Sequence, residues 1–253
     1  MLRKDDIVKL SKVTGLRPHQ QEKAYIQTLV LRSVFSHSDP VFKGGTSLMM
    51  VHGLNRFSED LDFTCGEKDT LEGLSQSIKD DLSAIGIEST IKENPTLENS
   101  ASFRIGARGP LFTKERERCF VNCDFSLREK VIGEPEARFI DPTYPDILPF
   151  SVRVMDPAEI AAEKVRAIMT RDKARDVFDL GFLISRGFVP TRTLIDAKLA
   201  YYSLSFSLED FHKCLMNKMG LWNTEMTADI IGRLPDFTDL SSKIFETIKM
   251  IET

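Results

Sequence analysis

The stretch that decides the fold is Lys43-Gly44-Gly45-Thr46-Ser47-Leu48, which follows the apolar pair Val41-Phe42. The pattern predicts a short strand over residues 41–43, a glycine turn, and a helix over residues 46–50 capped by Thr46. Two glycines between a strand and a helix let the backbone approach an anion closely. The free N–H groups at the helix start, with the hydroxyls of Thr46 and Ser47, can then bind phosphate.

The second stretch is Arg56-Phe57-Ser58-Glu59-Asp60-Leu61-Asp62-Phe63. Asp60 and Asp62 alternate with apolar residues, which predicts a strand with both carboxylates on one face. Two carboxylates held close repel each other unless a cation lies between them, and oxygen ligands suit Mg²⁺ whose shell is completed by substrate phosphates. Either motif alone is weak, because glycine turns and alternating surface strands are common. Together they indicate a site for a nucleotide and a metal.

The surrounding sequence alternates helices and strands up to about residue 155. The expected elements are helices over 18–35 and 71–85 and strands over 87–93, 102–107 and 119–126. In the last strand, Asp124 shares one face with Phe120 and Asn122. Prolines recur between residues 133 and 150, which favours short edge strands and loops there.

A helical half follows. Asp156-Pro157-Ala158-Glu159 combines a capping residue, proline at the first helical position and an early glutamate, the signature of a helix start. From there to Thr253 nearly all of the sequence has helical character. We therefore expect an α+β fold with two domains. Residues 1–155 would hold a mixed sheet with flanking helices, and residues 156–253 a helical bundle that completes a cleft.

The composition is that of an ordinary soluble globular protein. The 253 residues include 34 Lys and Arg against 38 Asp and Glu, so the net charge of −4 gives no global sign of a nucleic-acid partner. No apolar run approaches the roughly 20 residues of a spanning helix and no signal peptide is visible, so we expect a cytoplasmic protein without membrane contact. The cysteines and histidines form no metal-binding pattern, and we expect reduced, structural thiols.

The motifs resemble the polymerase-beta-like nucleotidyltransferase superfamily, in which a glycine turn and a helix precede a strand with two alternating aspartates. More narrowly, four blocks are similar to the AbiEii nucleotidyltransferase family, toxins of toxin–antitoxin and abortive-infection systems. The blocks are KGGTSL, RFSEDLDF, DPAEIAAEKVRA and RDVFDL, and they lie within residues 43–180. The 14 residues between Gly45 and Asp60 slightly exceed the superfamily's usual gap, which a longer helix or loop can absorb.

The resemblance implies a site that binds two metal ions. Asp124 is the candidate for a third carboxylate, which would join Asp60 and Asp62 in holding Mg²⁺, with Mn²⁺ as an alternative. In this chemistry one ion lowers the pKa of the acceptor hydroxyl, and both ions stabilise the in-line displacement at the α-phosphorus while pyrophosphate leaves.

The resemblance also implies roles for the helical half. Lys164 would neutralise the triphosphate, and one of Asp176 and Asp179 in the RDxxD block would belong to the active site. An alternative for Asp179 is a helix-surface salt bridge with Arg175 at i,i+4. The expected catalytic residues are Asp60, Asp62, Asp124, Lys164, Asp176 and Asp179. The expected nucleotide-binding residues are Lys43, Gly44, Gly45, Thr46, Ser47, Arg56, Ser58, Lys164 and Arg175.

The function implied by the resemblance is Mg²⁺-dependent transfer of NMP from NTP to an RNA hydroxyl, with the 3′ end of tRNA as the favoured acceptor, by a toxin that has a separately encoded antitoxin. Two alternatives remain open: a small-molecule or protein acceptor, and a nucleotide-binding or partner-binding module without turnover. Local basic clusters over residues 104–118 and 164–175 could serve an RNA acceptor, although solvated loops explain the first equally well.

Overall fold

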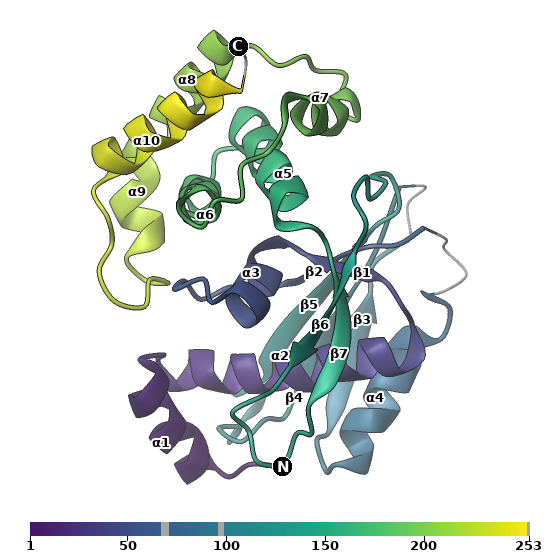
Figure 1. The fold of residues 1–253 in the computed structure, drawn as a ribbon. Helices are drawn as coiled ribbons and strands as arrows, with labels where there is room; N and C mark the ends of the chain where they lie inside the picture. Colours follow the sequence, from purple (N-terminus) through teal and green to yellow (C-terminus); the bar gives the residue numbers. More distant parts are fainter. Residues whose placement is uncertain (67–70, 96–98, 252–253) are drawn as a thin grey trace. The chain divides into compact units, whose positions relative to one another are not determined.

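Seven strands form one mixed β-sheet in the computed structural model, which describes residues 1–66, 71–95 and 99–251 (Figure 1). They are β1 Val41–Lys43, β2 Leu61–Thr64, β3 Ser89–Glu93, β4 Ser100–Ala107, β5 Cys119–Ser126, β6 Glu136–Ile140 and β7 Phe150–Val154. Their order across the sheet is β3-β4-β5-β2-β1-β7-β6. β2 runs parallel to β5 and β1 parallel to β7, and the other neighbouring pairs are antiparallel.

The parallel pair β2 and β5 gives the centre of the sheet two different faces. Its register places Asp62 beside Asp124 and Phe63 beside Phe125. Because side chains alternate along a strand, both aspartates lie on one face and both phenylalanines on the other. The two phenylalanine rings are stacked with their centroids 4.8 Å apart. The predicted alternation of acidic and apolar residues in these two strands is thus confirmed.

Two helices, α2 and α4, cover the apolar face of the sheet. The helices in the sheet-containing part of the chain are α1 Lys4–Thr14, α2 Pro18–His37, α3 Gly44–His52 and α4 Leu74–Ala84, with a 3-10 turn at Glu115–Glu117. Ile26 of α2 and Ile78 of α4 are fully buried in the same core cluster as Phe63. α2 packs against α4, β5 and β7 (Figure 1), whereas α3 contacts β1, β2 and β6.

Two local expectations need correction. Thr46 does not cap α3, because Gly44 adopts a left-handed backbone conformation (φ +75°) that begins the helix two residues earlier, with Lys43 as the N-cap. β7 was not indicated by the sequence pattern, yet it lies between β1 and β6 with Val152 and Val154 buried. The expected short edge strand in the proline-rich segment is confirmed as β6.

The second unit consists of Met155–Thr253 together with two short segments, Leu54–Arg56 and Val131–Glu134, whereas the first unit comprises Met1–Gly53, Phe57–Lys130 and Pro135–Val154. The helices of the second unit are α5 Pro157–Thr170, α6 Ala174–Ser185, α7 Arg192–Ala200, α8 Leu208–Met216, α9 Met219–Met226 and α10 Phe237–Met250. α5 packs against α6, α7 and α8, and α6 packs against α9 and α10.

The predicted start of α5 is confirmed. The Asp156 side chain accepts hydrogen bonds from the backbone N–H groups of Ala158 and Glu159 and so caps the helix. The Glu159 side chain does not complete a capping box. It accepts instead from the backbone N–H groups of Ile132 and Gly133, at 2.8–3.1 Å, which fastens the segment Val131–Glu134 to α5.

A fully buried lysine joins α7 to α5. Lys198 Nζ lies 2.6 Å from Glu159 Oε1 and 3.1 Å from Glu163 Oε1, and the Lys198 residue is 0% exposed. Burying a charge is costly unless it is paired and hydrogen-bonded, so the two carboxylates and the lysine depend on one another.

No helix in residues 1–66, 71–95 and 99–251 combines the length and apolarity needed to cross a bilayer. None of the four cysteines, all of which lie in the described ranges, forms a disulfide, and Cys65, Cys119 and Cys123 are buried.

Replacing Lys198 with methionine should destabilise the second unit by about 3–5 kcal/mol, because Glu159 and Glu163 would both lose the buried cation that they share. Urea unfolding followed by the fluorescence of Trp222, the only tryptophan, measures this effect inside the unit. Lys213→Met, at an exposed position of α8, is the matched control. Equal unfolding midpoints for the two variants would show that the buried pairs add nothing to stability.

Candidate active site

Three carboxylates gather on the face of β2 and β5 that the apolar core does not use. Asp62 and Asp124 are direct neighbours in the parallel register. Asp60 precedes Asp62 by two residues and therefore lies on the same side. Asn122 Nδ2 donates to Asp60 Oδ1 at 2.8 Å, which orients that carboxylate.

The pKa of Asp124 reflects this concentration of negative charge. Desolvation of the carboxylate by its surroundings, followed by the charges of Asp62 and Asp60, raises the pKa of Asp124 to about 6. A cation beside these groups would reverse the electrostatic part of the shift, because an opposite charge favours the ionised form. The charge of this face is therefore suited to a cation.

The ligand chemistry fits Mg²⁺, which prefers oxygen ligands and usually binds through one or two carboxylates plus substrate phosphates. Within the described ranges, no group of three or more His, Cys, Asp or Glu side chains already converges as a metal-binding cluster. Asp60, Asp62 and Asp124 thus lie near one another on β2, β5 and the residue before β2, but they do not form a complete set of metal ligands. An ion held there would keep coordination positions for substrate oxygens.

The start of α3 lies directly against Asp62. A Cβ atom built on Gly44 would come within 3.0 Å of Asp62 Cβ and closer still to the carboxylate, so the close approach requires glycine. The first N–H groups of a helix have no partner within the helix and can bind an anion. Gly44, Gly45 and Thr46 supply these groups in α3.

The hydroxyls at this helix start are already engaged. Thr46 Oγ1 donates a short hydrogen bond to the backbone oxygen of Asp60, and Ser47 Oγ donates to the backbone oxygen of Gly44 at 2.9 Å. Thr46 thus ties α3 to Asp60, the residue directly before β2. Because both hydroxyl protons are used, an anion would meet the backbone N–H groups rather than these side chains.

Two other expected nucleotide-binding residues of the first unit are buried. Lys43 is 8% exposed, and its Nζ lies 3.4 Å from Glu129 Oε2. Ser58 is 8% exposed, and its backbone oxygen accepts from Gln27 Nε2 at 3.1 Å.

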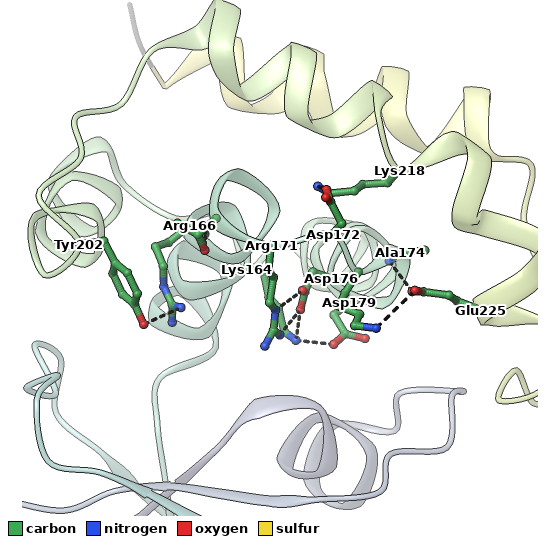
Figure 2. A network of polar contacts seen from close by, with 12 residues as sticks. Lys164, Arg166, Arg171, Asp172, Ala174, Asp176, Asp179, Tyr202, Lys218 and Glu225 are labelled. Atoms are coloured by element: carbon green, nitrogen blue, oxygen red, sulfur yellow. Dashed lines mark hydrogen bonds and ion pairs between the residues drawn. The ribbon is translucent and has the colours of Figure 1, made fainter. Parts of the chain in front are cut away.

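The residues expected around Lys164 form a buried network in the second unit. Figure 2 shows Lys164 and Arg171 pointing toward Asp176 and Asp179. Lys164 Nζ lies 2.9 Å from Asp176 Oδ1 and 2.6 Å from Asp179 Oδ2. Arg171 donates to both oxygens of Asp176, at 2.8 and 2.9 Å. Arg56 donates through Nε and Nη2 to the two oxygens of Asp179, both at 2.9 Å.

Charge pairing dominates the ionisation of this network. Burial alone would raise the pKa of Asp179, but Arg56 and Lys164 outweigh it and hold that pKa below its ordinary value. Burial is likewise outweighed at Asp176, where Lys164 and Arg171 lower the pKa. Both aspartates are 0% exposed, and both contact Lys164. They therefore belong to one buried network.

The helix-surface salt bridge considered for Arg175 and Asp179 is not formed. Asp179 points into the unit and pairs with Arg56, which is 123 positions away in the sequence, and with Lys164. A buried bidentate contact is stronger than an exposed i,i+4 pair, which contributes only a few tenths of a kcal/mol. Among the described residues, Arg175 is partly exposed and has no ion pair.

The family model described as "Nucleotidyl transferase AbiEii toxin, Type IV TA system" matches residues 29–246, which is most of the chain. The chain belongs to the AbiEii nucleotidyltransferase toxin family. This AbiEii protein is therefore a nucleotidyltransferase and the toxin of a type IV toxin–antitoxin system. Among curated proteins, no sequence matches the chain.

Solved structures of similar fold support the α+β architecture expected from the sequence. JHP933 from Helicobacter pylori is 21% identical with a TM-score of 0.62, over 92% of this AbiEii protein and 91% of that chain. MenT4, a nucleotidyltransferase toxin from Mycobacterium tuberculosis, is 17% identical with a TM-score of 0.67, over 100% of this chain and 90% of that one.

Some residues of the site were not anticipated. Asn122 was placed on the face of Asp124, but its contact with Asp60 depends on the pairing of β2 and β5, which alternation along one strand does not reveal. Glu129 and Arg171 pair with Lys43 and Asp176, respectively. Glu129 stands in no motif, so no sequence signal could have identified it.

Gly44→Ala should cost more stability than Gly53→Ala, although both glycines have φ +75°. Gly53 has open space around its Cβ position, so its substitution measures the left-handed backbone cost alone, about 1–2 kcal/mol. Gly44→Ala adds the collision with Asp62, for a further loss of about 1–3 kcal/mol. Calorimetric unfolding of the two variants tests the difference, and equal losses would contradict the close approach.

The pH dependence of stability should reveal the network around Asp179. Its folded-state pKa is lowered, so the stabilisation is present above the unfolded pKa of about 3.9 and is lost as pH falls through the folded pKa. Between about pH 5 and pH 2, the free energy of unfolding should fall more steeply for the natural protein than for Asp179→Asn, by at most about 1.4 kcal/mol per pH unit.

Trp222 fluorescence during urea unfolding at each pH measures these slopes. Asp196→Asn is the control, because Asp196 is an exposed carboxylate paired with Arg192. If Asp179→Asn and Asp196→Asn had the same slope as the natural protein, the buried pairs would not control acid stability.

Proposed function

We propose that this nucleotidyltransferase transfers an NMP from an NTP to the terminal 3′ hydroxyl of an RNA, with tRNA as the favoured acceptor, in a reaction that depends on Mg²⁺ or Mn²⁺. The observation that carries the proposal is the pairing of Asp62 with Asp124 on parallel strands, next to the glycine-led start of α3. Crowded carboxylates and an anion-binding helix start are what a nucleotide bound with a metal requires.

The site residues of the first unit have separate proposed roles. Asp60, Asp62 and Asp124 hold the metal, and Asn122 keeps the Asp60 carboxylate oriented. The backbone N–H groups at the start of α3 bind phosphate oxygens. Bound divalent ions would supply activation of the acceptor hydroxyl and stabilisation of charge on the transferred phosphoryl group.

In the second unit, Lys164 is proposed to bind the triphosphate. Asp176 and Asp179 hold its ammonium group in place, so little side-chain entropy would be lost on contact with a phosphate. Arg56 is 2% exposed and uses Nε and Nη2 on Asp179, which favours a positioning role for this residue. Arg171 is 47% exposed on its side chain and can extend the network toward solvent.

The proposed reaction accounts for toxicity. A nucleotide added to the 3′ end of tRNA would block aminoacylation and so translation, and a separately encoded antitoxin would counteract the effect.

The direct test incubates the protein with each α-labelled NTP and total tRNA. Asp60→Ala should lower the labelling rate at least about a hundredfold, because removing a metal ligand forfeits several kcal/mol of transition-state stabilisation. Glu59→Ala is the matched control, since Glu59 is the adjacent carboxylate, is exposed, and pairs with Lys23. Chelation of divalent ions should abolish labelling, and added Mg²⁺ or Mn²⁺ should restore it.

Periodate oxidation of the tRNA distinguishes the acceptor position. Oxidation destroys the terminal diol, so transfer to the 3′ end should stop. Persistent labelling would place the acceptor elsewhere in the RNA. Label on protein or on a small molecule, with none on RNA, would reject the RNA acceptor and keep the nucleotidyltransferase.

A further inference from the structure

One row of polar side chains crosses the exposed face of the sheet beyond the carboxylates. Lys92 of β3 is paired in register with Arg104 of β4, and Arg104 is paired with Asn122 of β5. Asn122 in turn contacts Asp60. Neighbouring strands are about 4.8 Å apart, so Arg104 stands roughly 10 Å from Asp60 along this row.

Arg104 is stacked on an exposed aromatic ring. Its guanidinium carbon lies 4.0 Å from the centroid of Phe120, and Phe120 is 38% exposed. The ring itself rests on Gly106, where a built Cβ would approach Phe120 Cε1 to 2.9 Å. The absence of a side chain at Gly106 therefore leaves the room that the ring occupies, and the exposed Arg104 stacks on that ring.

Lys92 and Arg104 are like charges directly opposite each other, an arrangement that weakens an antiparallel pair. Neither residue has an ion pair among those found in the described ranges. Other basic residues nearby are neutralised, since Arg108 pairs with Glu88 and Arg118 with Glu115. An anion bound at Lys92 and Arg104 would relieve their repulsion.

The in-line geometry of the displacement indicates which anion would bind at Lys92 and Arg104. In an in-line displacement the entering hydroxyl and the leaving pyrophosphate lie on opposite sides of the α-phosphorus. If phosphates are bound at the start of α3, beside β1 and β2, the acceptor approaches from the other side of the carboxylates. In the strand order that side is β5, β4 and β3.

We propose that Lys92, Arg104 and Phe120 form the binding surface for the RNA strand that carries the acceptor hydroxyl, an inference that rests on the proposed function. Lys92 and Arg104 contact backbone phosphates, and the stacked pair of Arg104 and Phe120 receives a base near the reacting end. Open sheet faces with an aromatic residue and basic neighbours suit this role, because stacking accepts any base.

The test measures binding of a short, fluorescein-labelled single-stranded RNA by anisotropy, which requires no turnover. Arg104→Glu should raise the Kd about tenfold or more and lower the slope of log Kd against log salt by about one. Phe120→Ala should raise the Kd about tenfold without changing that slope, since stacking is not ionic. Lys79→Glu should leave binding unchanged: Lys79 is an exposed lysine of α4, on the helix that covers the opposite face.

Labelling kinetics separate this surface from the proposed reaction. With tRNA as acceptor, Arg104→Glu should raise the KM for RNA and leave the KM for NTP unchanged. Arg104→Gln repeats the test if the glutamate variant fails to fold. Three results would overturn the proposed RNA-binding surface. They are unchanged RNA affinity in the Arg104 variants, an equal loss of affinity in Lys79→Glu, and no RNA binding by the natural protein. RNA binding that depends on Arg104 without any RNA labelling would support the surface and reject the reaction.

Discussion

The repulsion among three carboxylates on one face of two parallel strands is the constraint on which the rest of the site depends. Asp62 and Asp124 are neighbours, and the pKa of Asp124 is raised to about 6, first by desolvation and then by the adjacent charges. The opposite face of the same strands opposes this repulsion. Phe63 and Phe125 are stacked and buried there, and each buried side chain contributes about 1.5–3 kcal/mol. Apolar packing therefore keeps the carboxylates together.

In the second unit, the pKa of a buried carboxylate shifts in the opposite direction. Asp179 is fully buried but paired with Arg56 and Lys164, so its pKa is lowered rather than raised. This pairing also binds the segment Leu54–Arg56 into the helical unit, as Glu159 does for Val131–Glu134. Crowded charge on the open sheet face suits a cation, whereas each buried charge in the helical unit depends on its partner, because removal of one partner leaves the other uncompensated.

The near-zero sum of charges in the sequence conceals these separate arrangements. Basic residues over 104–118 looked like one cluster, but ion pairs neutralise Arg108 and Arg118, whereas Arg104 stacks on Phe120. Only the pairing of the strands reveals that Lys92 stands beside Arg104 and that the row continues to Asp60. A count of charged residues in a segment cannot separate the neutralised from the available ones.

The sequence by itself determined the elements and faces that follow from local periodicity. It predicted the alternation around Asp62 and Asp124, the helix begun at Asp156, and the AbiEii family, because strand faces, helix caps and motifs depend on neighbouring residues. Only the tertiary structure decided the partners of long charged side chains. Asp179 pairs with a residue 123 positions away rather than with Arg175 in its own helix. The physical reason is that a buried charge is costly unless it is paired, and which side chains are buried together is a property of the whole fold.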